Sequence, residues 1–153
     1  MDKLTDDFTR NLKRIRPDTA DKFIEEHEGE FYLAEKPYAA FMKKILKAKR
    51  LSQQEVFLRA DISERYGYKI LSEDKHTKQR DVIIRLCLAS RMSVDEIQQA
   101  LTLYELSPLF VKLKRDVLIA ACVNGKRFDI QEVNRFLTDH GEKPLQGNYS
   151  EKS

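Results

Sequence analysis

Apolar residues recur near every fourth position at the start of the chain, which is the spacing of one face of an α-helix. The residues that set this spacing are Leu4, Phe8, Leu12 and Ile15. They predict an amphipathic helix over about residues 3–16, which ends before Pro17 because proline disrupts a helix interior. A second short helix is predicted over 18–27, with Phe23 and Ile24 facing inward.

The next helical pattern begins at Pro37, which suits the first turn of a helix because its missing N–H would be unpaired there in any case. A wide apolar stripe follows, formed by Tyr38, Phe41, Met42, Ile45 and Leu46. Lysines occupy the opposite side. The pattern therefore predicts a helix whose apolar stripe faces a core.

Residues 52–71 carry the caps of two short helices joined by a tight turn. Ser52 is an N-cap with Glu55 three residues later, so that each side chain can bond the other's backbone N–H in a capping box. The first helix should therefore start at Gln53. Ser63 is the next N-cap, and Ile62 before it can fill the gap between the two helices.

The second of these helices is predicted from 64 to about 71. Tyr66 and Ile70 share one face, whereas Arg65, Lys69 and Ser72 share another. The first face suits a core. The second is left to contact a partner.

The remaining chain contains an internal repeat, which predicts two helical hairpins. Arg80-Asp81-Val82-Ile83-Ile84 with Cys87 is echoed 35 residues later by Arg115-Asp116-Val117-Leu118-Ile119 with Cys122. The second helix of each hairpin is opened by a cap with Glu three residues on, Ser93 in the first copy and Asp129 in the second. The second hairpin should stack on the first.

The caps, spacing and apolar turn residue of 52–71 resemble the helix-turn-helix of phage-repressor-like (Xre-type) DNA-binding domains. The resemblance covers roughly 38–101. In that family a Gln commonly opens the first helix, as Gln53 does here, and a Ser opens the recognition helix, as Ser63 does. It implies that the helix from Pro37 is the scaffold helix before the reading pair, and that the first hairpin completes the bundle.

Three positions depart from the family pattern. Family members usually carry Ala at the position of Phe57, Gly at that of Asp61 and a bulky aliphatic at that of Gly67. The residues matching Phe57 and Gly67 face each other in the family, so the two exchanges conserve volume. Asp61 tolerates the left-handed backbone that the turn requires.

Composition supports an all-α fold. The chain has 153 residues, of which 35% are charged, with five Gly, four Pro and no Trp, as expected of a helical protein rather than a sheet. We predict a repressor-like helix-turn-helix bundle with N-terminal helices and a repeated C-terminal hairpin. The predicted divisions are acidic N-terminal helices (1–36), the DNA-binding bundle (37–106), the added hairpin (107–146) and a loose tail (147–153).

Charge is unevenly distributed along the chain. Residues 1–36 hold seven Lys/Arg against ten Asp/Glu, residues 37–80 hold eleven against five, and residues 81–153 hold ten of each. The positive excess thus lies where a DNA-binding protein needs it to neutralise phosphates. A solvated face of the lysine-rich helix explains the same excess. The acidic N-terminal helices could pack on the body, pair with another subunit or protein, or lie against the basic helix.

Several function classes find no support in the sequence. The three histidines are scattered, and neither a phosphate-binding Gly-rich loop nor a metal-ligand cluster appears, so we expect no enzyme and no cofactor. Cys87 and Cys122 lie in apolar stretches, as buried reduced thiols do. No apolar run could span a bilayer and no signal peptide is recognised, so we expect a cytoplasmic location without membrane contact.

The predicted function is sequence-specific binding of double-stranded DNA, as a transcriptional regulator with the helix 64–71 in the major groove. Arg65 is the candidate for guanine, Glu64 for cytosine, with Tyr68 and Lys69 farther along the helix. The resemblance implies that Lys75 and Lys78, in the connector after this helix, contact DNA phosphates. The DNA-binding candidates are Gln53, Gln54, Ser63, Glu64, Arg65, Tyr68, Lys69, Lys75 and Lys78. Binding as a two-fold homodimer is usual for the motif. The alternative is a non-enzymatic helical adaptor that uses a degenerate helix-turn-helix to bind protein.

Overall fold

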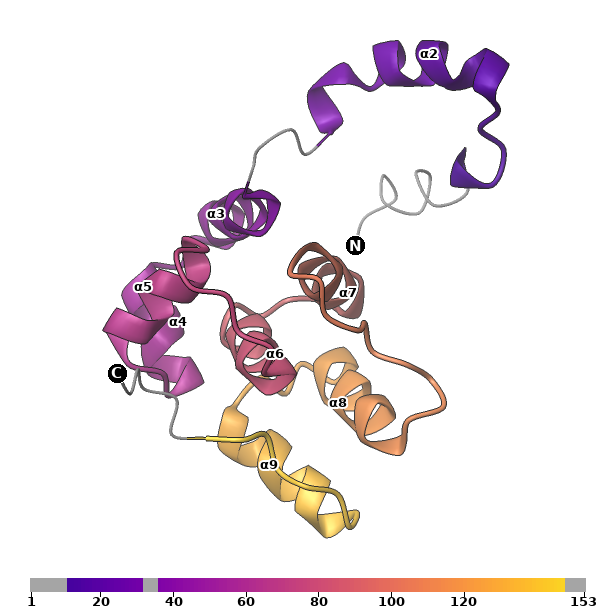
Figure 1. Cartoon of the computed structure of the whole chain (residues 1–153). Coiled ribbons are helices and arrows are strands. Elements are labelled where there is room, and N and C mark those ends of the chain that lie inside the picture. The colour runs from indigo at the N-terminus through magenta and orange to yellow at the C-terminus, as the bar shows by residue number, and fades with distance from the viewer. Residues whose placement is uncertain (1–10, 32–35, 148–153) are drawn as a thin grey trace. The chain divides into compact units, whose positions relative to one another are not determined.

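The computed structural model describes residues 11–31 and 36–147. The chain divides into two compact units, unit 1 (Met1–Glu35) and unit 2 (Lys36–Ser153). The predicted ranges 37–106 and 107–146 both fall in unit 2. The described residues form helices and no strand (Figure 1), which confirms the all-α class.

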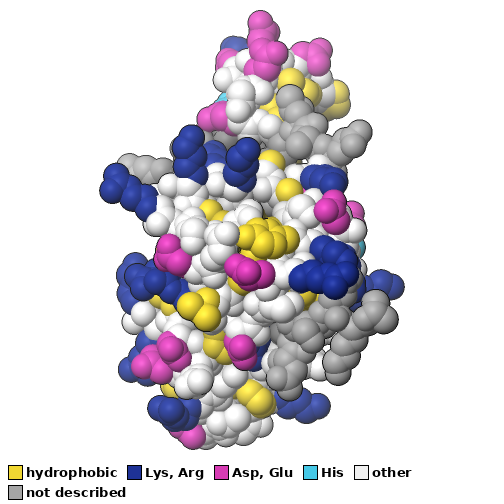
Figure 2. Space-filling view, turned by 90° about the vertical axis from the view of Figure 1, so that its left-hand side faces the viewer, with side chains coloured by type: hydrophobic (Ala, Val, Ile, Leu, Met, Phe, Trp, Pro, Cys, Tyr) yellow, Lys and Arg dark blue, Asp and Glu magenta, His cyan; other side chains and the backbone are white. Residues whose placement is uncertain are grey.

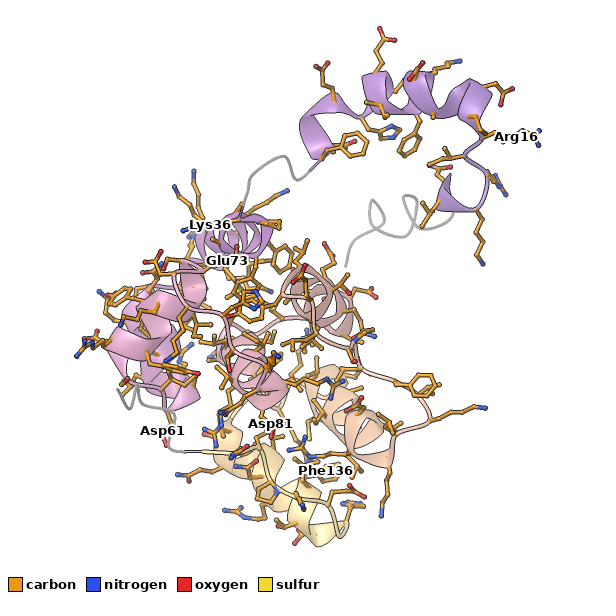
Figure 3. The ribbon with its side chains drawn as sticks, viewed as in Figure 1. Arg16, Lys36, Asp61, Glu73, Asp81 and Phe136 are labelled. Atoms are coloured by element: carbon orange, nitrogen blue, oxygen red, sulfur yellow. The ribbon has the colours of Figure 1, made fainter. Side chains whose placement is uncertain are left out.

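Unit 1 contains α2 (Pro17–Glu26) and the short 3-10 helix η1 (Glu28–Glu30). Most of the predicted helix 3–16 lies outside the described residues. The start of α2 is fixed by Thr19, whose hydroxyl accepts a hydrogen bond from the Arg16 N–H at 3.1 Å; Arg16 is labelled in Figure 3.

The predicted inward side of α2 is wrong for one residue. Ile24 is 52% exposed, and no residue of α2 is buried. Phe23 is half-buried and stacks on His27 with ring centroids 4.1 Å apart. Phe23 is covered locally by the rings of His27 and Phe31, whereas Ile24 lies on the exposed side of the helix.

Unit 2 consists of α3 (Pro37–Lys49), α4 (Gln53–Ala60), α5 (Glu64–Leu71), α6 (Arg80–Ala89), α7 (Val94–Leu103), α8 (Lys114–Asn124) and α9 (Ile130–Asp139). The predicted stripe of α3 is buried in full. α6 lies among the other helices (Figure 1), and every residue from 82 to 89 is buried. The predicted burial of Cys87 and Cys122 is confirmed, and burial raises the pKa of both thiols.

The two predicted hairpins form as α6–α7 and α8–α9. Ser93 and Glu96 complete the capping box, with bonds of 3.2 Å and 2.9 Å. Asp129 accepts from the Glu132 N–H at 3.1 Å. The repeat therefore reports a real duplication of local structure.

The two hairpins are joined by exchanged Arg–Asp pairs. Arg80 donates two hydrogen bonds to the Asp116 carboxylate, at 2.9 Å and 2.8 Å, and Arg115 donates two to Asp81, at 2.9 Å and 3.0 Å. Each Arg also donates to the loop that ends its own hairpin. Arg80 bonds the carbonyls of Ser107 and Pro108, and Arg115 bonds those of Lys143 and Pro144. The contact is thus reciprocal, with an approximate two-fold relation, rather than the head-to-tail stacking of a solenoid.

Arg85 ties the C-terminal segment to α4. Its side chain is nearly buried and donates to the carbonyls of Ala60 at 2.9 Å, Leu145 at 3.0 Å and Gln146 at 2.6 Å. The carbonyl of Ala60 belongs to the last turn of α4, where the helix dipole favours a positive charge. The predicted tail from 147 lies beyond this contact, and 148–153 are outside the described residues.

No helix of the described residues combines the length and the apolar character needed to cross a membrane.

Candidate nucleic-acid interface

The α4–α5 pair follows the predicted boundaries. α4 starts at Gln53 and α5 spans Glu64 to Leu71. Ser52 Oγ accepts from the Glu55 N–H at 3.1 Å, and Ser63 Oγ accepts from the Tyr66 N–H at 3.3 Å. The predicted reciprocal half of the first capping box differs, because the Glu55 carboxylate accepts from the Ser52 hydroxyl at 3.3 Å.

The turn between α4 and α5 is set by Asp61 and Ile62. Asp61 has φ 56° and ψ 50°, the left-handed conformation, which a short polar side chain tolerates better than most. Ile62 is 5% exposed and fills the angle between the helices. Both roles were predicted, and Figure 3 labels Asp61 at the end of α4.

α5 divides sharply into a buried and an exposed side. Tyr66, Gly67, Ile70 and Leu71 are buried. On the other side Glu64 and Arg65 are exposed, Tyr68 is 38% exposed and Lys69 is half-buried. The polar face of this helix is therefore presented at the surface, and its first turn bears the exposed Glu64 and Arg65.

Two of the candidate residues contact each other. Gln54 Nε2 donates to the Tyr68 hydroxyl at 2.8 Å, which joins the first turn of α4 to the middle of α5. The ring of Tyr68 also meets that of Phe57 edge to face, with centroids 5.0 Å apart. Sequence reasoning missed this bond, since its only signal was that both side chains fall on the polar sides of their helices. Gln53 and Ser63 are exposed, at the starts of α4 and α5.

The connector after α5 is held in place by polar contacts. The Glu73 carboxylate accepts from the Ala39 N–H in the first turn of α3 at 3.0 Å, and Lys36 bonds Asp74 at 3.2 Å. Figure 3 labels Lys36 and Glu73, close together near the start of α3. An acidic side chain at a helix N-terminus is stabilising. The connector is therefore tied to α3.

Tyr104, at the C-terminal end of α7, holds the connector between α5 and α6 as well. Its hydroxyl donates to the Lys75 carbonyl at 3.0 Å and accepts from the Thr77 N–H at 3.1 Å. Burial raises the pKa of Tyr104 to about 12, so the hydroxyl keeps its proton and remains a donor at neutral pH. The ring of His76 stacks on that of Tyr104, with centroids 3.9 Å apart.

The two connector lysines differ in their surroundings. Lys75 is half-buried, and its Nζ lies 5.5 Å from the centre of the Tyr66 ring, as in a cation–π contact. Lys78 is exposed.

Basic side chains border this face of unit 2. Figure 2 shows it from the side of α3, α4 and α5, with Lys and Arg at both edges and hydrophobic and acidic side chains between them. On α3, Lys43, Lys44 and Lys47 are exposed. The described residues contain no group of three or more His, Cys, Asp or Glu that could hold a metal ion.

Comparisons with family models, with curated proteins and with solved structures gave no match for this chain.

Proposed function

We propose that this protein binds double-stranded DNA with sequence specificity, with α5 in the major groove. One observation carries the proposal. One side of α5, which carries Tyr66 and Ile70, is buried, and the other side is exposed. The exposed side begins with Glu64 and Arg65, directly after the Ser63 cap. The major groove admits an α-helix, and the N-terminal residues of a recognition helix are those that reach base edges.

The residues of this face have distinct roles in the proposal. Arg65 pairs with guanine through its two-pronged guanidinium, Glu64 accepts from cytosine, and Lys69 lies one turn farther along. Tyr68 is positioned by Gln54, which limits its freedom before DNA arrives. A side chain that is already ordered loses less entropy on binding.

Phosphate contacts orient the protein in this proposal. Gln53 at the start of α4 binds one phosphate, and the exposed lysines of α3 with Lys78 bind others. Lys75 contributes charge from its position over Tyr66. The excess of eleven Lys/Arg over five Asp/Glu in 37–80 supplies the field for this binding.

The resemblance to phage-repressor-like domains supports the same function. The caps at Ser52 and Ser63, the left-handed residue at Asp61 and the buried Ile62 are the features on which that resemblance rests. We propose that unit 2 is a repressor-like helix-turn-helix bundle extended by α8 and α9. Two copies would bind half-sites about 34 Å apart, as is usual for this motif.

The test is selection of bound duplexes from a random pool by the full-length chain, followed by titration of the selected site at rising salt. A recovered motif, with binding that falls steeply as salt increases, supports the proposal. Binding without any enriched motif would reduce the function to non-specific DNA association. No binding at low salt would overturn it.

A protein-binding adaptor is the second candidate, favoured by one observation. Leu58 on α4 is 83% exposed, beside a surface that also carries the partly exposed ring of Tyr68. Exposed apolar side chains of this kind suit a protein interface better than a phosphate backbone. An adaptor would show little affinity for duplex DNA at any salt concentration, so the same titration separates the two candidates.

A further inference from the structure

The duplicated hairpins allow the surface of α8 to be compared with the equivalent surface of α6. α6 and α8 are copies of one sequence pattern, 35 residues apart, and α8 carries apolar residues on more than one side. A helix that is apolar all round is normally covered on all sides. α6 meets this rule because α4 packs against it, and Arg85 marks that contact through its bond to Ala60.

α8 exposes two positions whose counterparts on α6 are buried. Val117 is 43% exposed, whereas its counterpart Val82 has no exposure. Ala121 is exposed, whereas its counterpart Leu86 is buried. Figure 1 shows α8 on the other side of α6 from α4 and α5.

The loop before α8 also exposes apolar side chains. Phe110 is 54% exposed, Val111 79% and Leu113 52%. In the second half of the repeat the offset is 36 residues, as Pro108-Leu109 and Pro144-Leu145 show, so Gln146 and Gly147 stand where the first hairpin has Phe110 and Val111. The exposed apolar pair Phe110 and Val111 is therefore not a feature of the repeat. We define the α8 face as Phe110, Val111, Leu113, Val117 and Ala121.

The exposed charges along the segment that carries the α8 face, residues 110–127, have one sign. The exposed charged residues between positions 110 and 127 are Lys112, Lys114, Lys126 and Arg127. Asp116 is the one acid in this range, and it is 2% exposed and bonded to Arg80. Contiguous apolar surface with a charged rim is typical of a protein-binding site.

We propose that the α8 face binds a short amphipathic helix of another protein, one whose polar side is acidic. On α6, a helix of only eight residues, α4, packs against the core helix of the first hairpin, so a short helix is a suitable occupant for α8 as well. The basic rim selects an acidic partner by charge complementarity. It also opposes a second copy of the same face, because Lys112 and Lys114 would meet basic residues there.

The experiment uses the full-length chain and a fluorescein-labelled peptide of about 16 residues, long enough to form a helix, with Leu at helical spacing and Glu elsewhere. Two comparison peptides carry the same residues in scrambled order, or Lys in place of each Glu. Fluorescence anisotropy should show saturable binding of the acidic amphipathic peptide and at least about tenfold weaker binding of both comparison peptides.

Two substitutions connect this binding to the α8 face. Val117→Glu and Phe110→Ser should each weaken binding of the acidic peptide by about tenfold or more. Ala48→Glu is the matched control, because it adds the same charge at an exposed apolar residue of another helix, α3, and it should leave peptide affinity unchanged. Circular dichroism checks folding. If Val117→Glu does not fold, Phe110→Ser in the loop decides.

Three results would overturn the proposal. The first is failure of the acidic peptide to bind, or equal binding of the scrambled or Lys peptide. The second is wild-type affinity of folded Phe110→Ser. The third is a different occupant: self-association in sedimentation velocity that Val117→Glu abolishes would assign the face to a second copy, and loss of random-duplex binding on the same substitution would assign it to nucleic acid.

Discussion

Phe57 and Gly67 share one space between α4 and α5. A Cβ at position 67 would lie 2.8 Å from Phe57 Cγ and closer still to two other ring carbons. The large residue on α4 is therefore accommodated by the missing side chain on α5. The resemblance to phage-repressor-like domains implied that the two positions face each other, and the structure places the Phe57 ring directly against position 67.

The first prediction concerns this pair. Gly67→Leu should lower the free energy of unfolding by about 1–3 kcal/mol, because the new side chain overlaps the Phe57 ring. Phe57→Ala should lower it by about 3–5 kcal/mol through the cavity that it leaves. In the double variant each change relieves the other, so the loss should be clearly smaller than the sum of the two.

Urea unfolding followed by circular dichroism measures this double-mutant cycle. Gly29→Ala is the control, since nothing lies within 4 Å of the added methyl group. Losses that simply add would show that positions 57 and 67 do not share space.

The features that sequence could predict are those decided within a few residues. The N-caps at Ser52 and Ser63 and the left-handed Asp61 depend on neighbouring backbone groups, and all three are confirmed. Arg80 and Arg115 were recognised as copies of one pattern, but their carboxylate partners lie 36 and 34 positions away in sequence. No local sequence pattern predicts that each Arg pairs with the Asp of the other hairpin.

Arg85 shows a second limit of local reasoning. A charged residue inside an apolar run is usually expected at the surface. Its burial depends on carbonyls that arrive from Ala60 on one side and from Leu145 and Gln146 on the other. Only tertiary structure brings these three acceptors to one guanidinium.

The ion pair between Arg115 and Asp81, which joins the two hairpins, predicts that stability depends on pH. Burial acts to raise the pKa of Asp81, but hydrogen bonds from Arg115 and the Gln146 N–H, with the nearby Arg charges, lower it on balance. A carboxyl whose pKa is lower in the folded state stabilises the fold above the unfolded pKa of about 3.9. That contribution is lost as pH falls through the lower, folded pKa.

Asp81→Asn should therefore lower the free energy of unfolding at pH 7 by about 1–2 kcal/mol, since Asp81 keeps some contact with solvent. The difference from wild type should shrink below about pH 4. Denaturant unfolding at several pH values measures both effects. Asp74→Asn at the exposed Lys36 pair is the control and should change stability little. An unchanged difference at low pH would assign the loss to packing rather than to charge.

Arg85→Lys should weaken the join between α4 and the C-terminal segment. A lysine cannot reproduce the planar fork that donates to three separate carbonyls, so we expect a loss of about 2 kcal/mol in the free energy of unfolding. Hydrogen exchange at the Leu145 N–H should also become faster. Arg91→Lys makes the same chemical change at an exposed position and should alter neither quantity. Wild-type exchange at Leu145 would contradict the role given to Arg85.

Arg65→Ala tests whether α5 reads bases. If the exposed guanidinium pairs with one guanine, its removal should cost about 1–3 kcal/mol of affinity for the selected site and relax the preference at a single position. Loss of a phosphate contact would instead weaken binding to all sequences alike and reduce the salt dependence. Affinities are measured for the selected duplex and for variants changed at one base pair each. Arg59→Ala, on the exposed side of α4 where the Arg pairs with Glu55 at 3.7 Å, is the matched control. Arg59→Ala should not relax the preference at any position, because no residue of α4 enters the groove in this arrangement. If Arg59→Ala changed the specificity and Arg65→Ala did not, the surface that reads bases would lie on α4 rather than on α5.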